Sequence, residues 1–492
     1  MSKLVDAIQQ DTNFTTTENG AKTPISTLSA VLDFFYHAPA RRGQDNTALF
    51  LSALSGDRQT AIRALFYVRD IRGGQGERET FRQGLRLLQA NFNDLFKSIL
   101  AYVPEYGRWD DMIEFVNDPC VQDMVKAQFA ADFDTLRAGN SVSLLAKWLP
   151  SANTSSNKTK ALARKWVQVL GLTEKDYRKT LSALRARIDI VEAKISAKSW
   201  TAVNYSSVPS KASLRYRRAF VRHDLARYQE FLAKVMKGEA KINAGTLYPY
   251  ELVQKYLNSG SGYYGYGEDS VEPLDATVEA LWSQLPNYAD TDTNSLVVCD
   301  VSGSMFSGGN PQPIAVSVSL AIYLAERNRG VFKDSFLTFS EVPSLQKLQG
   351  KTLFEKVRNL SQADWGMSTD LQAVFSLILE TAVAHQIPQS EMPTKIFIVS
   401  DMEFNMACDD DTNFEAIKQS YLTSGYEMPT LVFWNVASRN KQAPVTKDEA
   451  GTMLVSGCSP SIFKNTVNCK ATTPEELMME VLNGARYSKI VI

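Results

Sequence analysis

The sequence has no long hydrophobic run. Across its 492 residues, no uninterrupted apolar stretch approaches the roughly 20 residues that a membrane-spanning helix needs. Residues 1–6 lack the apolar core of a signal peptide. Apolar residues make up 44% of the chain and charged residues 22%, as is ordinary for a globular protein of two or more domains. We therefore expect a protein without a membrane segment.

Cysteine and histidine are both scarce. The cysteines are odd in number and never form a Cys-x-x-Cys pair; they are Cys120, Cys299, Cys408, Cys458 and Cys469. This pattern argues against a disulfide framework or a structural zinc site and favours the reducing cytoplasm. With only three histidines, the usual general base is rare, which disfavours hydrolytic triads and zinc catalysis.

Charge is distributed unevenly along the chain. The whole sequence has a formal net charge of −1, yet residues 141–241 hold 21 Lys and Arg against 7 Asp and Glu. Residues 271–492 hold 16 against 26. A basic region of this size favours a polyanion such as nucleic acid as its partner. The alternative is that it docks onto the acidic region or onto another protein.

Most of the first half is expected to be helical. After a polar N-terminal arm, residues 1–27, apolar residues in 28–256 recur at three- and four-residue spacing, as in 61–67 and 81–96. Many helices with short connections favour stacked helical hairpins, a solenoid of HEAT-like character.

A linker and an α/β domain are expected next. Residues 257–274 are rich in Gly, Ser and Tyr; the tyrosines are more typical of packing contacts than of base stacking, which is the alternative. In residues 275–492 strand and helix patterns alternate, which predicts an open, mostly parallel, Rossmann-like sheet covered by helices. The fold class is thus multidomain, all-α followed by α/β. Strands are expected at 295–300, 335–339, 395–400, 430–435 and 452–456.

Oxygen-bearing side chains follow two of these strands. Asp300, Ser302 and Ser304 come directly after the first strand, Thr369 lies in a loop before a helix, and Asp401 follows a later strand. Because ligands bind at the carboxyl ends of parallel strands, we expect the five side chains to converge. Carboxylates and hydroxyls are hard donors that suit Mg²⁺ or another divalent cation. Five such donors leave a position for a carboxylate from a partner.

This order and spacing resemble the metal-ion-dependent adhesion site of von Willebrand factor A domains. The resemblance implies a site that binds a partner rather than one that catalyses a reaction. A phosphoryl-accepting role for Asp300 is the alternative, which the serines at 302 and 304 disfavour. The acidic residues 409–411 are more typical of a solvated loop than of a second cation site.

A helical domain followed by an adhesion-site domain resembles the Ro autoantigen family, whose helical part is called the TROVE module. Several strings look closer to a related, largely uncharacterised branch shared by plants, microbes and viruses. The resemblance implies a ring-like helical solenoid closed by the metal-site domain. It also implies RNA bound on basic helical surfaces, because Ro proteins bind small structured RNAs and single-stranded RNA ends. The strings are residues 69–78, 106–111, 147–151, 208–212 and 219–224.

Basic residues gather in three stretches of the helical region. Arg215, Arg218 and Arg222 have a spacing that places them on one face of a helix, where they can neutralise phosphates. Trp148 could stack on an unpaired base, although a core position is favoured because its segment is apolar. The candidate RNA-binding residues are Lys158, Lys160, Arg164, Lys165, Arg185, Arg187, Lys211, Arg215, Arg218 and Arg222.

Two further motifs are interpreted as structural. Residues 72–76, Arg-Gly-Gly-Gln-Gly, lack the Lys-Ser/Thr of a phosphate-binding loop, so we expect a turn between helices. His223 beside Asp224 could form a catalytic pair, but a structural histidine is favoured in this basic helix.

The features together favour a non-enzymatic RNA-binding protein. Its helical domain would bind RNA, and its other domain would hold Mg²⁺ and capture a protein partner. The alternative is a metal-dependent protein-interaction scaffold without RNA binding. A nuclease is disfavoured because nuclease metal sites cluster more carboxylates than this sequence offers.

Overall fold

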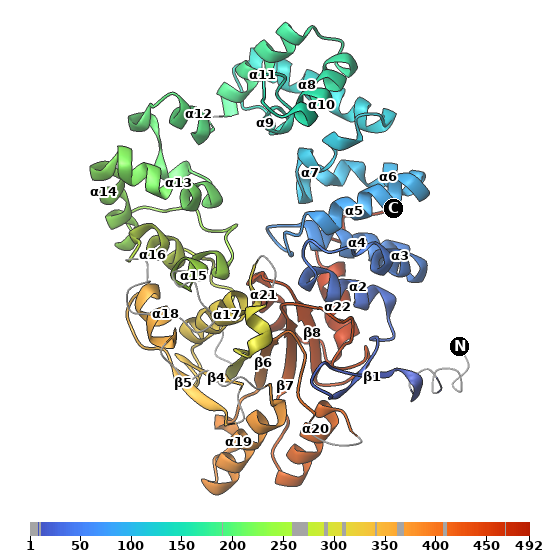
Figure 1. The fold of residues 1–492 in the computed structure, drawn as a ribbon, viewed down its shortest axis with the longest axis vertical. Helices are drawn as coiled ribbons and strands as arrows, with labels where there is room; N and C mark the ends of the chain where they lie inside the picture. Colours follow the sequence, from blue (N-terminus) through green and yellow to red (C-terminus); the bar gives the residue numbers. More distant parts are fainter. Residues whose placement is uncertain are drawn as a thin grey trace. The chain divides into compact units, whose positions relative to one another are not determined.

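Figure 1 shows the computed structural model of the chain. By their contacts the residues divide into two compact units, Met1–Gln83 with Ala244–Lys489 and Gly84–Asn243 with Ile490–Ile492. The predicted linker tyrosines lie outside the described part of the chain. The structure describes residues 8, 11–188, 190–257, 274–289, 294–307, 311–339, 342–361, 369–406, 411–467 and 469–492.

The first unit contains a six-stranded sheet with the order β5-β4-β3-β6-β7-β8. All neighbouring strands are parallel except β4 and β5. The central strands are buried along their whole length, as in a sheet covered on both faces. The α/β prediction is confirmed, and five strands lie where they were expected. The strands are β3 (Ser295–Cys299), β4 (Ser335–Thr338), β5 (Ser344–Lys347), β6 (Lys395–Ser400), β7 (Thr430–Asn435) and β8 (Thr452–Ser456).

Helices cover this sheet. Helix α17 (Pro313–Arg327) is buried through most of its length, because its apolar side chains surround the helix, and it packs on β3, β4 and β6. Helices α19 (Leu371–Ala384) and α20 (Asn413–Ser424) lie side by side (Figure 1). The other helices of this part are α15 (Pro249–Leu257), α16 (Ala276–Ser283), α18 (Leu353–Ser361), α21 (Ser461–Val467) and α22 (Pro474–Asn483).

The N-terminal segments belong to the same unit as the sheet. Strands β1 (Phe14–Thr16) and β2 (Lys22–Pro24) form an antiparallel hairpin, so the described part of the predicted extended arm is folded. Helix α2 (Ala30–His37) is buried from Val31 to His37 except at the half-buried Asp33, and it packs on β8 and α22. Helices α3 (Thr47–Gly56) and α4 (Arg58–Arg69) pack on α2. The units therefore differ from the predicted domain boundaries, because the apolar surface of α2 is buried against the sheet layer.

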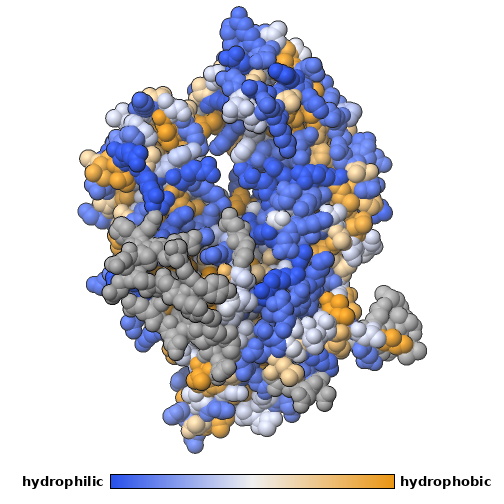
Figure 2. Space-filling model, viewed as in Figure 1, coloured by the Kyte–Doolittle hydropathy of each residue, from blue (hydrophilic) through white to orange (hydrophobic). Residues whose placement is uncertain are grey.

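The regular elements among the described residues of the second unit are all helices, as the sequence predicted. Trp166 is fully buried in it, and its indole N–H donates to the carbonyl of Ile113 (3.1 Å). On the molecular face drawn in Figure 2, hydrophilic residues predominate and apolar residues are scattered among them. Helix α5 (Glu79–Asn91) begins just before this unit. The helices that follow are α6 (Asn93–Ile99), α7 (Val103–Tyr106), α8 (Pro119–Arg137), α9 (Leu145–Trp148), α10 (Asn157–Val169), α11 (Glu174–Ile188), α12 (Val191–Ser196), α13 (Ser210–His223) and α14 (Leu225–Met236).

Among the helices of the described residues, none combines the length and the apolar character that crossing a bilayer requires. None of the described cysteines, Cys120, Cys299, Cys458 and Cys469, forms a disulfide bond with another described residue.

Candidate functional site

Two carboxylates follow adjacent parallel strands. In the register of β3 and β6, Cys299 lies beside Val399, and the N–H of Asp300 donates to the carbonyl of Val399 (3.0 Å). Asp300 and Asp401 therefore stand at the same edge of the sheet, where both chains leave their strands. This is the edge at which open parallel sheets bind ligands.

Asp300 is completely buried and its carboxylate is held by hydrogen bonds. Its Oδ1 accepts the N–H of Ser302 (2.9 Å), and its Oδ2 accepts the hydroxyl of Ser400 (2.5 Å). Burial raises the pKa of Asp300, although these hydrogen bonds and Arg439 act in the opposite direction. A buried carboxylate in this setting gains from a nearby cation.

Asp401 feels the charge of Asp300. Burial, followed by the negative charge of Asp300, raises the pKa of Asp401 to about 6, while hydrogen bonding to Ser304 and the charge of Arg439 lower it. The two carboxylates thus lie close enough to repel each other. Such a pair is stabilised by a cation that both can contact.

Hydroxyl groups complete the oxygen cluster. The Oγ atoms of Ser302 and Ser304 are 3.1 Å apart, and Ser304 in turn contacts Asp401. Thr369 is buried, and its carbonyl accepts the N–H of Asn405 (3.0 Å), which ties its loop to the segment after Asp401. Residues 366–368 of the predicted loop lie outside the described residues.

The donor chemistry fits a hard divalent cation. Four of the five predicted ligands are linked by the contacts above, and their donors are carboxylate and hydroxyl oxygens. Among the described residues, no three His, Cys, Asp or Glu side chains group together as metal ligands. A cation held here would therefore need hydroxyl oxygens in addition to the two carboxylates.

Two charged residues at this cluster are absent from the sequence prediction. The Nη2 of Arg439 donates to Oδ2 of Asp401 (2.8 Å) and also lies 3.1 Å from Oε2 of Glu18. Arg439 follows β7, and Glu18 lies between β1 and β2, so no local spacing connects either of them with the Asp300 motif. Only the folded chain brings them together.

A small cavity opens at this cluster. Its volume is about 260 Å³, and it is lined by Ser304, Asp401 and Arg439 together with Arg42 and other residues of the first unit. The cavity is large enough for one acidic side chain.

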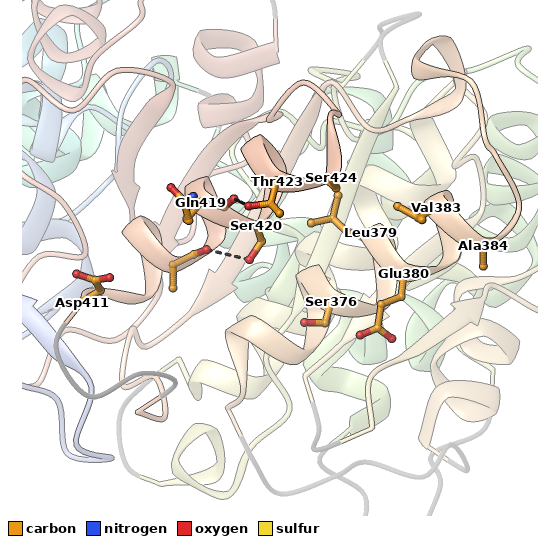
Figure 3. A pocket seen from close by; sticks show the side chains of 11 residues that line it. Ser376, Leu379, Glu380, Val383, Ala384, Asp411, Gln419, Ser420, Thr423 and Ser424 are labelled. Carbon is orange, nitrogen blue, oxygen red and sulfur yellow. Dashed lines mark hydrogen bonds between the residues drawn. The ribbon is translucent and has the colours of Figure 1, made fainter.

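A wider groove in the same unit lies between α19 and α20 and is shown in Figure 3. Its volume is about 680 Å³, and Ser420 and Thr423 on its wall donate their hydroxyls to carbonyls of their own helix. The groove contains none of the predicted metal ligands.

Helix α13 presents a basic surface. Lys211, Arg215, Arg218 and Arg222 are exposed, whereas Leu214 and Phe220 of the same helix are buried. We call the four exposed basic residues the α13 surface. Their spacing of four, three and four residues keeps them on one side of the helix.

The other predicted RNA-binding residues differ in exposure. Lys158, Arg164 and Lys165 are exposed, and Lys160 is half-buried. Arg187 is exposed, and its Nε donates to the carbonyl of Asn140 (3.0 Å).

Arg185 uses its guanidinium inside the second unit. Nε donates to the carbonyl of Ala146 (2.8 Å), Nη2 to the carbonyl of Leu149 (2.7 Å), and Nη1 to the hydroxyl of Ser151 (2.8 Å). These contacts hold α11 on α9 and on the chain after it. In the structure Arg185 therefore has a structural role, in contrast to the phosphate contact that the sequence suggested.

A basic groove lies between α11 and α12. Its volume is about 780 Å³, and Lys175, Arg178 and Lys179 are among the residues that line it. All three are exposed. The sequence pointed to a basic region here, but the groove itself depends on how α12 packs against α11.

Comparisons with known proteins place the chain in a family. Residues 294–487 match a domain of unknown function (DUF7788), and residues 17–94 and 167–288 match a domain of unknown function (DUF2828). The chain is 31% identical over 517 residues to "Uncharacterized protein L728" of Acanthamoeba polyphaga mimivirus, covering 96% of this chain and 87% of that protein. The chain belongs to the L728 family. The predicted branch, shared with viruses, is confirmed.

Among solved structures, this L728-family chain is similar to the Ro (RSR) protein of Deinococcus radiodurans. The alignment covers 93% of this chain and 100% of the other, with 14% sequence identity and a TM-score of 0.40.

One of the strings that suggested the family, residues 69–78, forms a turn in which Asp70, Gly74 and Gln75 are buried and Arg72 and Arg78 are exposed. Asp70 is fully buried, pairs with Arg486, and accepts the hydroxyl of Tyr487 (3.0 Å). A Cβ on Gly74 would lie 2.0 Å from the carbonyl oxygen of Tyr67, so only glycine fits there. This string is therefore a packing element of the L728-family chain and not a phosphate loop, as expected.

His223 and Trp148 also have identifiable contacts. The ring of His223 stacks on Trp200 with centroids 4.5 Å apart, while Asp224 accepts the hydroxyl of Tyr205 (2.6 Å). His223 and Asp224 thus have separate partners, as the structural interpretation required. Trp148 is half-buried rather than in the core, and the guanidinium of Arg108 lies 4.5 Å from its ring centre.

Proposed function

We propose that this protein binds RNA through the α13 surface and captures a protein partner through the cation site. The observation that carries the RNA proposal is the row of exposed basic side chains on α13, within a helical unit whose sequence region has a strong excess of Lys and Arg. Such a row neutralises successive phosphates without reading sequence. The sequence resemblance to Ro proteins supports the same polyanion.

The groove between α11 and α12 is a second basic surface of the same unit. The hydroxyl of Tyr216 on α13 lies 3.4 Å from Oε1 of Glu192, which lines that groove. An RNA strand that extended from α13 past Glu192 would also reach Lys175, Arg178 and Lys179. A groove of this kind suits a single strand, because an unpaired backbone can follow a narrow basic channel.

The partner proposal concerns the oxygen cluster. Asp300, Ser302, Ser304, Thr369 and Asp401 would hold Mg²⁺ or a similar cation. The cation would attract an external carboxylate, and the cavity beside Ser304 and Asp401 would admit it.

We propose binding rather than catalysis. His37 is buried, and burial lowers its pKa to about 3, which makes it a weak general base. His223 stacks on a tryptophan. The cellular compartment proposed with this function is the cytoplasm, for which the scattered and odd-numbered cysteines of the sequence are the reason.

Binding of the full-length protein to single-stranded and structured RNA across a salt series tests the RNA proposal. Replacing Arg215, Arg218 and Arg222 by Glu should weaken binding at least tenfold and reduce the slope of log K against log salt by about 2, since each lost contact to a single strand removes about 0.7. The matched control reverses Lys97, Lys126 and Lys234, which are exposed and paired with acidic neighbours in the same unit. It has the same change of charge and should retain most of the affinity.

The same assay separates the two halves of the proposal. Asp300→Ala should abolish metal-dependent capture of a partner and leave the RNA affinity unchanged. Equal weakening by the control and the α13 reversal would show that only total charge matters. Salt-insensitive or absent RNA binding would favour the protein-interaction scaffold instead.

A further inference from the structure

A positively charged side chain, that of Arg439, contacts the oxygen cluster. Arg439 donates to Asp401, one of the proposed metal ligands, and reaches Glu18 with the same Nη2 atom. Asp401 is nearly fully buried, and the Arg439 side chain is 33% exposed, so the guanidinium lies at the mouth of the cluster. It occupies the approach to Asp401 that a cation or its ligand would share.

Glu18 is held in place by the docked N-terminal hairpin. Its N–H donates to Oε2 of Glu403 (2.8 Å), and the side-chain amide of Asn19 donates to the carbonyl of Glu403 (2.6 Å). The hydroxyl of Thr17 donates to the carbonyl of Phe404 (2.7 Å). The hairpin is thus attached to the segment that follows Asp401 directly.

The contacts continue along this segment. The N–H of Met406 donates to the carbonyl of Asn19 (3.2 Å), and Gly20 forms a bridge with Asn405. Asn440, which is next to Arg439 in the sequence, provides a second connection. Its side-chain amide donates to Glu18 (3.1 Å) and to Glu403 (3.1 Å). Asp401 is therefore connected to the hairpin by a short series of hydrogen bonds.

We propose that Arg439 neutralises the proposed metal site when no metal is bound. Glu18 is the alternative ion-pair partner of Arg439. Without metal, Arg439 neutralises Asp401. When a divalent cation binds Asp401, it repels the guanidinium, which then pairs with Glu18 alone. Metal binding and docking of the N-terminal hairpin are consequently coupled. This inference rests on the proposed metal site and adds the residues that set its affinity.

The coupling follows from charge and from linkage. A guanidinium 2.8 Å from a nearly buried carboxylate competes with a second cation for the same oxygen. If metal strengthens the Arg439–Glu18 pair, then that pair must strengthen metal binding by the same factor, because linkage is reciprocal. Removing Arg439 and removing Glu18 should therefore act in opposite directions.

Titration of the full-length protein with Mn²⁺ alone, followed by electron paramagnetic resonance, measures this directly. Arg439→Gln should tighten Mn²⁺ binding about tenfold, and Glu18→Gln should weaken it several-fold, within the usual range of coupling between sites. In the double variant, the Glu18 substitution should have almost no further effect. Lys418→Gln, a surface residue paired with Glu449, removes the same charge elsewhere and should leave the affinity unchanged.

Hydrogen exchange of the hairpin gives the reciprocal measurement. In the wild type, Mn²⁺ should slow exchange of residues 14–24, and in Arg439→Gln it should not. If Glu18→Gln weakened Mn²⁺ binding equally with and without Arg439, the inference would be overturned. Glu18 would then act on the metal through its own charge and not through its pair with Arg439. An unchanged affinity in Arg439→Gln would overturn it as well.

Failure of the metal site itself is distinguishable. If the wild type and Asp300→Ala bind Mn²⁺ equally, the proposed site and this inference both fail. If Mn²⁺ binding depends on Asp300 but is unchanged by substitution of Arg439 or Glu18, only the inference fails.

Discussion

At the scale of single residues, His37 shows how burial changes acid–base behaviour. Its Nδ1 lies 3.1 Å from the hydroxyl of Ser438, and its Nε2 has no hydrogen-bond partner among the described residues. Burial, with the charges of Arg41 and Lys441, lowers its pKa from 6.5 to about 3. The folded protein therefore keeps this ring neutral at a pH where the unfolded chain binds a proton.

The sign of the resulting pH dependence is fixed. Below pH 6.5 the unfolded chain binds a proton at His37, whereas the folded protein does not. The free energy of unfolding therefore falls as the pH is lowered toward 3. The slope from this group is at most about 1.4 kcal/mol per pH unit. Between pH 6.5 and 5, the free energy of unfolding of the wild type should fall by about 1.6 kcal/mol more than that of His37→Asn.

Urea unfolding at several pH values checks this, and Asn is chosen because it can keep a hydrogen bond to Ser438. His385→Asn, at the exposed end of α19, serves as the control and should follow the wild type. Parallel curves for the wild type and His37→Asn would show that His37 is protonated in the folded state.

At the scale of elements, the sequence predicted secondary structure best where a strand is apolar along its whole length. The buried apolar runs of β3, β6 and β7 allow little choice of structure, and the two aspartates follow them by chain connectivity alone. Strand β5 escaped prediction because its residues are largely exposed and it pairs only with β4. Hairpin β1–β2 escaped because it is stabilised by contacts almost 400 positions away, such as Thr17 with Phe404.

The same limit applies to side chains at the two sites. The spacing of Arg215, Arg218 and Arg222 within one helix is enough to place them on one face. Arg185 has the same composition signal, but its role depends on carbonyls in another element. Arg439 and Glu18 were missed for this reason too, because nothing in their own segments refers to Asp401.

A prediction about α11 follows. Arg185→Ala removes three hydrogen bonds from a charged group that joins α11 to α9 and should lower the free energy of unfolding by about 2–3 kcal/mol. Arg187→Ala, which removes a single exposed contact, should change it by less than about 0.5 kcal/mol. The folded fraction of Arg185→Ala should bind RNA as tightly as the wild type. A loss of RNA affinity without a loss of stability would make Arg185 a phosphate contact.

At the scale of the molecule, the first unit joins the two ends of the chain. The N–H groups of Ser438, Ala443 and Lys447 donate to carbonyls of Ala40, Pro24 and Thr27. Asp70 binds Arg486 and Tyr487 from the other end of the sequence. The α/β part predicted from the sequence, residues 275–492, therefore lacks part of its own core when it stands alone.

This deficit can be tested with residues 275–492 in isolation. Helix α2 buries Val31, Leu32, Phe34 and Phe35. Since each such side chain contributes about 2 kcal/mol, their loss removes a large share of the 5–15 kcal/mol that holds a typical domain folded. We expect the isolated segment to bind a hydrophobic dye and to melt without a sharp transition in calorimetry. Adding residues 1–83 as a separate chain should restore a cooperative transition.

As a control, residues 275–492 are combined with residues 1–83 in which Phe34 and Phe35 are replaced by Ser. It keeps the length and charge of the added chain but not the apolar surface, so it should fail to restore the transition if burial of α2 is the cause. A sharp transition of residues 275–492 alone, at the temperature of the full-length protein, would show instead that the sheet needs no cover from the N-terminal helices. The domain boundary drawn from the sequence would then be the physical one.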